Sequence, residues 1–274
     1  MIKGSKTHGA RNGLPYIQLN VPTKSPAKNA KGFTLVELLA AVVILALLAG
    51  LCVAGFQKTV ESSKTGRCAS NLRTLAQAVL NYSADERGMV PPAMVMADPA
   101  ETGGVGHRLW IDFLQPYIPP LQGHEKTHPY LCPSAHRPGL WNNRCPDYGC
   151  SLRWSEAENV GAFALQSWNP EPHPAEMRVA RIQNPSQLIM FTDSYASNSI
   201  YQSGLWGMDL RGITNGTSGA QLLASGLAPR HQVRGQTGLG KFNAAFFDGH
   251  VESIDVEDPH LKDPEIRQRW VSVP

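Results

Sequence analysis

A long apolar segment with one carboxylate inside it constrains this 274-residue chain more than any other feature. Residues 38–55 carry no charge, and the segment 33–55 reaches the roughly 20 residues that a helix needs to cross a bilayer. A carboxylate at the bilayer centre costs about 2.5–3.5 kcal/mol, so Glu37 predicts a functional contact with a cationic partner. We therefore expect a transmembrane helix over residues 33–55 in which Glu37 has a role of its own.

The flank that precedes this segment is basic. Residues 1–32 hold no Asp or Glu and six cationic residues: Lys3, Lys6, Arg11, Lys24, Lys28 and Lys31. Because such flanks stay in the cytoplasm, we expect the remainder of the chain outside it. A secretory or lipoprotein signal would share this flank. The first needs a small-residue cleavage site after a shorter apolar core, and the nearest lipoprotein-like site has Leu51 directly before Cys52.

Residues 31–39, with the sequence KGFTLVELL, resemble the processing segment of the type IV pilin and pseudopilin superfamily. Its prepilins carry a basic leader that ends in Gly, followed by Phe or Met and by a Glu at the fifth mature position. The resemblance implies that prepilin peptidase cleaves between Gly32 and Phe33 and methylates the new amine of Phe33. It also implies that Glu37 pairs with the N-terminal amine of a neighbouring subunit, which would remove a lone buried charge.

Loss of the leader would reverse the net charge of the chain. Six of the 25 Lys and Arg residues lie in residues 1–32, which leaves 19 against 22 Asp and Glu, a net charge of −3. A slightly acidic chain lacks the basic surface of most nucleic-acid-binding proteins, so no nucleic acid partner is expected. With 42% apolar residues, the chain has room for one globular core beyond the apolar segment.

Five cysteines gain meaning from the expected export, because an oxidising compartment permits disulfides. Once Cys52 in the apolar segment is set aside, the other four can pair in three ways. Related pilin-like proteins have a helix cysteine before Asn-Leu and a head cysteine in Leu-Cys-Pro-Ser, and this resemblance implies Cys68–Cys132 and Cys145–Cys150. A zinc site is the alternative, although its spacing lacks a C-x2-C knuckle: Cys132, His136, Cys145 and Cys150.

A helical apolar period continues beyond the membrane segment and predicts one helix over residues 34–82. Its outer part offers one apolar stripe to a core: Phe56, Val60, Leu72, Leu75, Ala76, Val79 and Tyr82. Residues 86–88 and the prolines at 91–92 end this helix. A second, short helix is expected over residues 110–117.

Four strands are predicted in the C-terminal half: residues 179–182, 188–192, 242–247 and 250–255. An Asn-Pro-Ser turn separates the first two. Asp248-Gly249 joins the last two and predicts a hairpin with a type I′ turn, which needs positive φ at both central residues.

One long N-terminal helix followed by antiparallel strands predicts an α+β fold. The resemblance implies its pilin-like form, in which the helix packs on a small antiparallel sheet with long loops. Five parts are expected: a leader over 1–32 removed on maturation, a transmembrane and assembly helix over 33–55, its amphipathic continuation over 56–90, a globular head over 91–258 and a polar tail over 259–274.

A further resemblance lies in the C-terminal half. Arg230-His231 and Asp248-Gly249-His250 resemble an element of one branch of prepilin-like proteins, where a histidine stands nine residues before Asp-Gly. Here sixteen residues separate His231 from Asp248. One interpretation is structural: Asp248-Gly249 forms a turn, and Arg230 and His231 pair with it to close the sheet. The other brings four residues together as metal ligands or an acid/base set: Asp193, His231, Asp248 and His250.

No nucleophile elbow, His-Glu-x-x-His motif or Walker sequence occurs, so we expect no enzymatic activity and no cofactor. Some secretion pseudopilins bind calcium, which makes calcium the one ion that the resemblance brings into consideration. Five carboxylates collect near the C-terminus, but their spacing matches no calcium loop and predicts an acidic solvated tail: Asp255, Glu257, Asp258, Asp263 and Glu265.

The resemblance implies a structural subunit: a single-pass inner-membrane protein with a cytoplasmic leader and a periplasmic or extracellular head, incorporated into a type IV pilus or a type II secretion pseudopilus. Its expected partners are prepilin peptidase, other pilin-like subunits, the inner-membrane assembly machinery and the membrane. One alternative is a tethered metal-dependent hydrolase. Another is an anchored binding module that never polymerises and holds polysaccharide or protein with its tryptophans: Trp110, Trp141, Trp154, Trp168 and Trp206.

Overall fold

The computed structural model describes residues 32–103, 106–119, 127–135, 146–153, 162–164, 177–194, 207–208, 226–234 and 239–258. The predicted polar tail and residues 1–31 of the predicted leader lie outside them. The chain divides into two compact units, residues 1–51 and residues 52–274. The second unit contains the sheet, the buried core and the outer part of the first helix.

Helix α1 (Leu35–Asp85) is close to the range that the apolar period predicts. It ends as expected at the Glu-Arg-Gly sequence, where Gly88 has a φ of 84° and its N–H donates to Ser83 O at 2.6 Å. Helices commonly close with a left-handed residue after the last turn, and glycine adopts that conformation without a Cβ clash.

The transmembrane segment predicted over residues 33–55 includes residues 51–55, whose side chains lie outside the described part of the chain. Apolar side chains before this gap are exposed, Phe33 by 83% and Leu45 by 65%. No helix among the described residues combines the length and the apolar character that spanning a bilayer requires.

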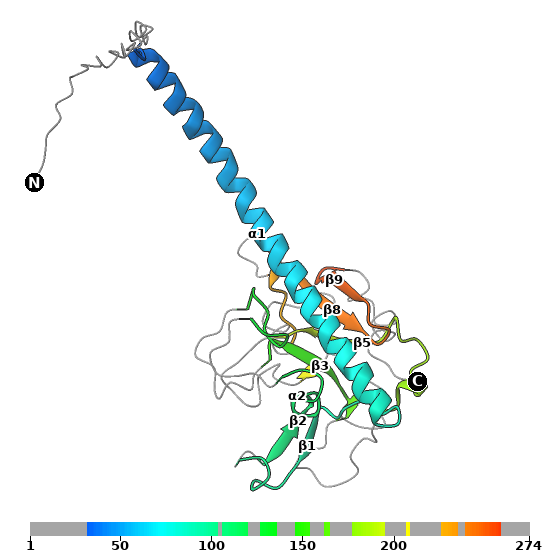
Figure 1. The fold of residues 1–274 in the computed structure, drawn as a ribbon. Coiled ribbons are helices and arrows are strands. Elements are labelled where there is room, and N and C mark those ends of the chain that lie inside the picture. The colour runs from blue at the N-terminus through cyan, green and yellow to red at the C-terminus, as the bar shows by residue number, and fades with distance from the viewer. Residues whose placement is uncertain are drawn as a thin grey trace, which may run out of the picture. The chain divides into compact units, whose positions relative to one another are not determined.

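A seven-stranded sheet forms the body of the second unit (Figure 1). Five strands follow one another across the sheet in the order β4 (Phe163–Ala164), β3 (Tyr148–Arg153), β5 (Ile189–Asp193), β8 (Leu239–Phe246) and β7 (His231–Arg234). Two further strands pair outside this order: β6 (Gly207–Met208) with β3, and β9 (Val251–Asp255) with β8. The pairs β3–β5, β5–β8, β7–β8 and β8–β9 are antiparallel, whereas β4 and β6 run parallel to β3. The fold is therefore α+β, with a mixed sheet in place of the purely antiparallel one expected.

A two-stranded ribbon, β1 (Met94–Met96) and β2 (His107–Leu109), leads directly into helix α2 (Trp110–Phe113). This helix is shorter than the one predicted over residues 110–117. The chain beyond it continues in turns, in which Leu114 O accepts the N–H groups of both Tyr117 and Ile118 at 2.9 Å.

The strand predicted over residues 179–182 is wrong. The segment forms a 3-10 helix, η2 (Val179–Arg181). Its apolar side chains favour a strand, but its N–H groups bond elsewhere: Val179 N–H to Gly88 O at 2.8 Å and Ile182 N–H to Val179 O at 3.0 Å. Tertiary contact with the chain after α1 outweighs local strand preference here.

The β8–β9 hairpin is present, but its turn is not the predicted type I′. Strand pairing reaches Ala245 and Val251, Gly249 N–H donates to Phe246 O at 2.9 Å, and Phe246 N–H donates to His250 O at 3.0 Å. Of the turn residues, Gly249 alone has a positive φ, 90°. This is a type I turn followed by a glycine bulge, which needs one left-handed residue where type I′ needs two.

The predicted stripe of α1 contributes to the core only along the outer part of the helix. Leu72, Leu75, Ala76 and Val79 are fully buried in one cluster with residues of the sheet, whereas Phe56 is 71% exposed. Burying a leucine-sized side chain contributes about 1.5–3 kcal/mol relative to leaving it exposed. The outer part of α1 is therefore held by the head itself, which positions the side chains that α1 brings to the site.

Candidate functional site

The processing segment begins the described chain at Gly32. Thr34 and Glu37 cap the start of α1 reciprocally: Glu37 Oε2 accepts from the Thr34 N–H and hydroxyl, both at 2.9 Å, and Thr34 Oγ1 accepts from the Glu37 N–H at 3.3 Å. This Thr-x-x-Glu capping box satisfies backbone donors that no helical partner can reach. The Glu37 carboxylate thus contacts the N–H of Thr34, the residue that follows Phe33, whose amine cleavage before Phe33 would create.

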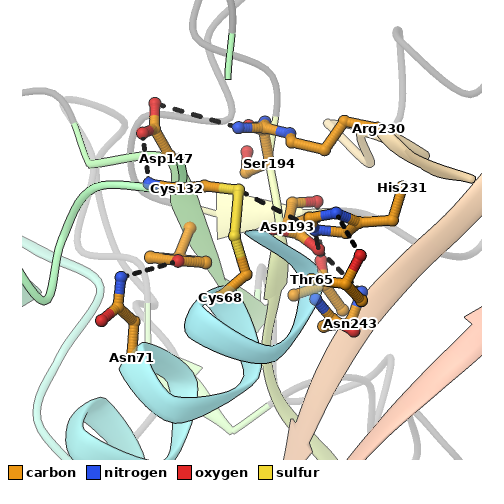
Figure 2. Close-up of polar contacts among 12 residues, drawn as sticks. Thr65, Cys68, Asn71, Cys132, Asp147, Asp193, Ser194, Arg230, His231 and Asn243 are labelled. Atoms are coloured by element: carbon orange, nitrogen blue, oxygen red, sulfur yellow. Dashed lines mark hydrogen bonds and ion pairs between the residues drawn. A yellow bond between two sulfur atoms is a disulfide. The ribbon is translucent and has the colours of Figure 1, made fainter. Parts of the chain in front are cut away.

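A disulfide fastens α1 to the head. Cys68 of α1 and Cys132 are bonded across 64 residues of sequence, as the resemblance implies (Figure 2). Asn71, one turn further along α1, donates its side-chain amide to Leu131 O at 2.7 Å and to Tyr148 Oη at 3.3 Å. One face of the helix is thus tied both to the segment before β3 and to β3 itself.

The other predicted cysteine pair stays a prediction. Cys150 is fully buried in β3, but Cys145 lies outside the described residues. The alternative zinc set also includes His136, which lies outside them as well, and its Cys132 is engaged with Cys68 instead.

His231, the first residue of β7, lies beside the disulfide. Its Nε2 is 3.8 Å from Cys132 Sγ and 3.1 Å from Asp193 Oδ2, and its Nδ1 is 3.3 Å from Thr65 Oγ1 and 3.9 Å from Glu61 Oε1. The side chains of His231 and Asp193 are both fully buried. One imidazole therefore links α1, the disulfide and the end of β5 (Figure 2).

Arg230, the preceding residue, contacts a second buried carboxylate. Its Nη2 donates to Ser194 O, and its Nη1 is 3.9 Å from Asp147 Oδ1. Asp147 Oδ2 accepts the Cys132 N–H at 2.7 Å, and Asp147 O accepts the Ser194 N–H at 2.8 Å. Arg230 is thus linked to Cys132 through Asp147, whereas His231, the next residue, contacts Cys132 directly.

The Asp-Gly turn has its own partners. Asp248 Oδ1 is 2.5 Å from His250 Nδ1 and accepts the His250 N–H at 3.0 Å, while the His250 ring stacks on Phe246 with centroids 4.3 Å apart. Burial alone would raise the pKa of Asp248, but the hydrogen bonds from His250 and its charge lower the pKa overall. The turn is therefore stabilised within the hairpin, and the predicted pairing of Arg230 and His231 with it is wrong.

The predicted set of four metal or acid/base residues comes together only in part. His231 and Asp193 meet, whereas Asp248 and His250 pair with each other. Within the described ranges, one group of possible ligands has all its ligand atoms within 4.8 Å of one another, and every member is buried: Cys68, Cys132, Asp193 and His231. The sequence predicted the Cys68–Cys132 pair and grouped Asp193 with His231, but it did not bring the two pairs together, because the four residues come from separate segments.

One residue of this cluster and one neighbour carry polar atoms without a hydrogen-bond partner in the described part of the chain. They are Asp193, through Oδ1, and Asn243, through both side-chain atoms. The other carboxylate oxygen, Asp193 Oδ2, accepts the Asn243 N–H at 2.7 Å. A buried polar atom that lacks a partner costs about 1–3 kcal/mol, so the cluster keeps unused acceptor capacity at a cost in stability.

The tryptophan surface of the binding-module alternative does not include Trp110. This side chain is fully buried, and its ring lies 4.8 Å from that of Phe191 and 5.7 Å from that of Tyr130 between centroids. Burial makes Trp110 a core residue. The other four tryptophans of that prediction lie outside the described residues: Trp141, Trp154, Trp168 and Trp206.

The calcium candidates fall at the end of β9 and beyond it. Asp255 Oδ1 accepts the Glu257 N–H at 3.0 Å, and Asp255 O accepts the Asp258 N–H at 2.9 Å. These contacts form a turn after the strand. Asp263 and Glu265 lie outside the described residues, so calcium binding stays untested.

Comparison with known proteins bears on the N-terminal segment alone. No curated protein and no solved structure matches the chain. Residues 27–53 match the family model described as the prokaryotic N-terminal methylation motif. This range contains the Gly32–Phe33 junction, the Thr34–Glu37 capping box and most of the apolar segment. The chain therefore carries a prepilin segment of the kind found in type IV pilins and pseudopilins.

Proposed function

We propose that this protein is a pilin-like structural subunit. Prepilin peptidase would cleave it between Gly32 and Phe33 and methylate Phe33, after which residues 33–55 would anchor it in the inner membrane and enter a filament. The match of residues 27–53 to the N-terminal methylation motif carries this proposal. The filament would be a type IV pilus or a type II secretion pseudopilus, with the head outside the cytoplasm.

The contacts of Glu37 suggest how assembly would proceed. In this structure the carboxylate accepts two hydrogen bonds from Thr34. A carboxylate has room for further donors, so the same group can take the methylated amine of a neighbouring subunit. The role is mechanical: helix packing and this charge pair would offset the free-energy cost of removing each helix from lipid.

Mass spectrometry of the protein purified from its own cells tests the processing step. A mature chain that starts at Phe33 with one added methyl group is the expected result. A chain that retains residues before 33, or starts beyond 50, contradicts the proposal.

Substitution of Glu37 tests assembly separately. We expect Glu37→Val to keep membrane insertion and processing while incorporation into sheared filaments falls at least tenfold. Glu101→Val, at an exposed turn of the head, is the matched control and should assemble normally. Equal incorporation of both variants contradicts the assembly role of Glu37, and absence of the wild-type protein from sheared filaments favours the binding module that never polymerises.

A further inference from the structure

We propose that the reduced head binds one zinc ion between Cys68, Cys132, Asp193 and His231, and that formation of the Cys68–Cys132 disulfide releases it. The four ligand atoms lie within 4.8 Å of one another, and all four residues are buried. Two thiolates, an imidazole and a carboxylate are ligands of the kinds that zinc prefers. This site is independent of filament assembly.

Two distances within the cluster are close to those of a tetrahedral site. With bonds of about 2.3 Å to sulfur and 2.0–2.2 Å to nitrogen or oxygen, tetrahedral zinc holds its ligand atoms roughly 3.3–3.8 Å apart. His231 Nε2 lies 3.8 Å from Cys132 Sγ and 3.1 Å from Asp193 Oδ2. The two sulfur atoms are the pair that must separate, and reduction of the disulfide permits this.

The surroundings of His231 orient its ring for a metal. Thr65 donates its hydroxyl hydrogen to Glu61 O at 3.0 Å, so its oxygen can accept a hydrogen bond from His231 Nδ1, 3.3 Å away. Once zinc replaces the contact between Nε2 and Asp193, a proton on Nδ1 would leave the Nε2 lone pair free to bind the metal. Zinc-binding histidines commonly donate their second N–H in this way.

The carboxylate and its neighbours supply the remaining features of a site. Asp193 Oδ1 is buried without a hydrogen-bond partner among the described residues, although Oδ2 is fixed by the Asn243 N–H. A metal ion would give this oxygen the partner that it lacks. Two thiolates, one carboxylate and Zn²⁺ sum to a charge of −1, which is small for a buried site.

The chemistry balances in both directions. On binding, the two reduced thiols lose two protons and form two Zn–S bonds. On oxidation, a disulfide-bearing oxidant takes two electrons from the thiolates and two protons from solvent, Zn²⁺ leaves, and the S–S bond of Cys68–Cys132 forms. A chain made in the reducing cytoplasm and exported to an oxidising compartment would first bind zinc and then, once only, replace it with the disulfide.

The full chain in detergent provides the test, reduced with a phosphine under nitrogen and compared with the oxidised chain. After dialysis against Zn²⁺ and then buffer, we expect about one zinc per reduced chain and at least tenfold less in the oxidised chain. Cobalt in place of zinc should show tetrahedral bands with thiolate-to-metal charge transfer. Zinc retention that is equal in the two states, or cobalt without thiolate charge transfer, overturns the proposal.

Variants locate the site. Cys132→Ser and His231→Gln should each weaken zinc binding at least tenfold, whereas Cys150→Ala and His250→Gln, which remove the same groups elsewhere, should leave it unchanged. Circular dichroism checks that each variant is folded. Should a variant fail to fold, the reduced and oxidised wild-type chains still decide the question without any substitution. Equal binding by wild type and a folded Cys132→Ser contradicts the assignment.

Discussion

His231 Nε2 lies 3.1 Å from Asp193 Oδ2, and neither side chain is exposed to solvent. The contact joins the first residue of β7 to the last residue of β5, two strands that are separated in the sheet by β8. Because Nδ1 of the same ring approaches Thr65 of α1, this histidine also connects the sheet to the helix. The histidine before Asp-Gly therefore acts at the helix–sheet junction and not at the turn.

Removal of one member of this pair should destabilise the head strongly. His231→Ala leaves Asp193 Oδ2 buried without the imidazole, and leaving a buried polar group without its partner costs about 1–3 kcal/mol. The double variant His231→Leu with Asp193→Asn should lose less unfolding free energy than the sum of the losses in His231→Leu alone and Asp193→Asn alone. Urea unfolding of the full chain, followed by tryptophan fluorescence, measures each value; strictly additive losses contradict the coupling.

Loss of the disulfide should also destabilise the head. The bond closes a loop of 64 residues, and restricting such a loop in the unfolded chain contributes about 4 kcal/mol in the chain-entropy treatment. We expect Cys68→Ser with Cys132→Ser to lower the urea midpoint and to make it insensitive to reductant. A midpoint of the double variant equal to that of the oxidised wild type contradicts this.

The capping box makes a prediction at the start of α1. Thr34→Val removes the hydroxyl that Glu37 contacts, and loss of an N-cap typically costs about 1 kcal/mol of local stability. Amide hydrogen exchange over residues 35–38 should accelerate about fivefold. Thr74→Val is the matched control, because Thr74 is exposed in mid-helix and its hydroxyl donates to Ser70 O at 3.1 Å. Equal exchange in the two variants contradicts a cap.

Two glycines should respond to alanine with opposite signs. A Cβ on Gly240 would lie 2.7 Å from His231 O and 2.9 Å from Pro229 O, both backbone atoms that cannot move aside cheaply. Gly240→Ala should therefore destabilise the β7–β8 pair by about 1–3 kcal/mol. Gly66 is exposed in α1 with nothing within 4 Å of its Cβ position, so Gly66→Ala should stabilise by up to about 1 kcal/mol. Thermal unfolding of both variants measures the contrast, and a shift in the same direction for both contradicts it.

The hairpin turn should make stability depend on pH in the acid range. The pKa of Asp248 is lowered from 3.8 in the folded head, so its contribution is present above about pH 4. It is lost as pH falls through the folded-state pKa, because protonation then removes the charge that His250 contacts. Asp248→Asn should lower stability at pH 7 and flatten its fall below pH 4. Parallel stability curves for the two proteins contradict this role.

Local sequence patterns predicted the elements whose cause is local. The apolar period gives α1 its range, Gly88 closes it, and the strand-forming residues on both sides of Asp248-Gly249 give the hairpin. Local patterns failed where long-range contacts decide. Residues 179–182 have strand-forming side chains, yet their backbone bonds to the chain after α1. The Asp-Gly dipeptide permits two kinds of turn, and the register of β8 and β9 selects the one with a single left-handed residue.

By itself the sequence determined the prepilin segment, because the residues that define this motif form one contiguous run. It also named, through resemblance, the disulfide that the structure contains. Only the tertiary structure decided that this disulfide lies against His231 and Asp193. Those side chains meet because α1, the segment before β3, β5 and β7 pack around one core, and packing across segments leaves no periodic mark along the chain.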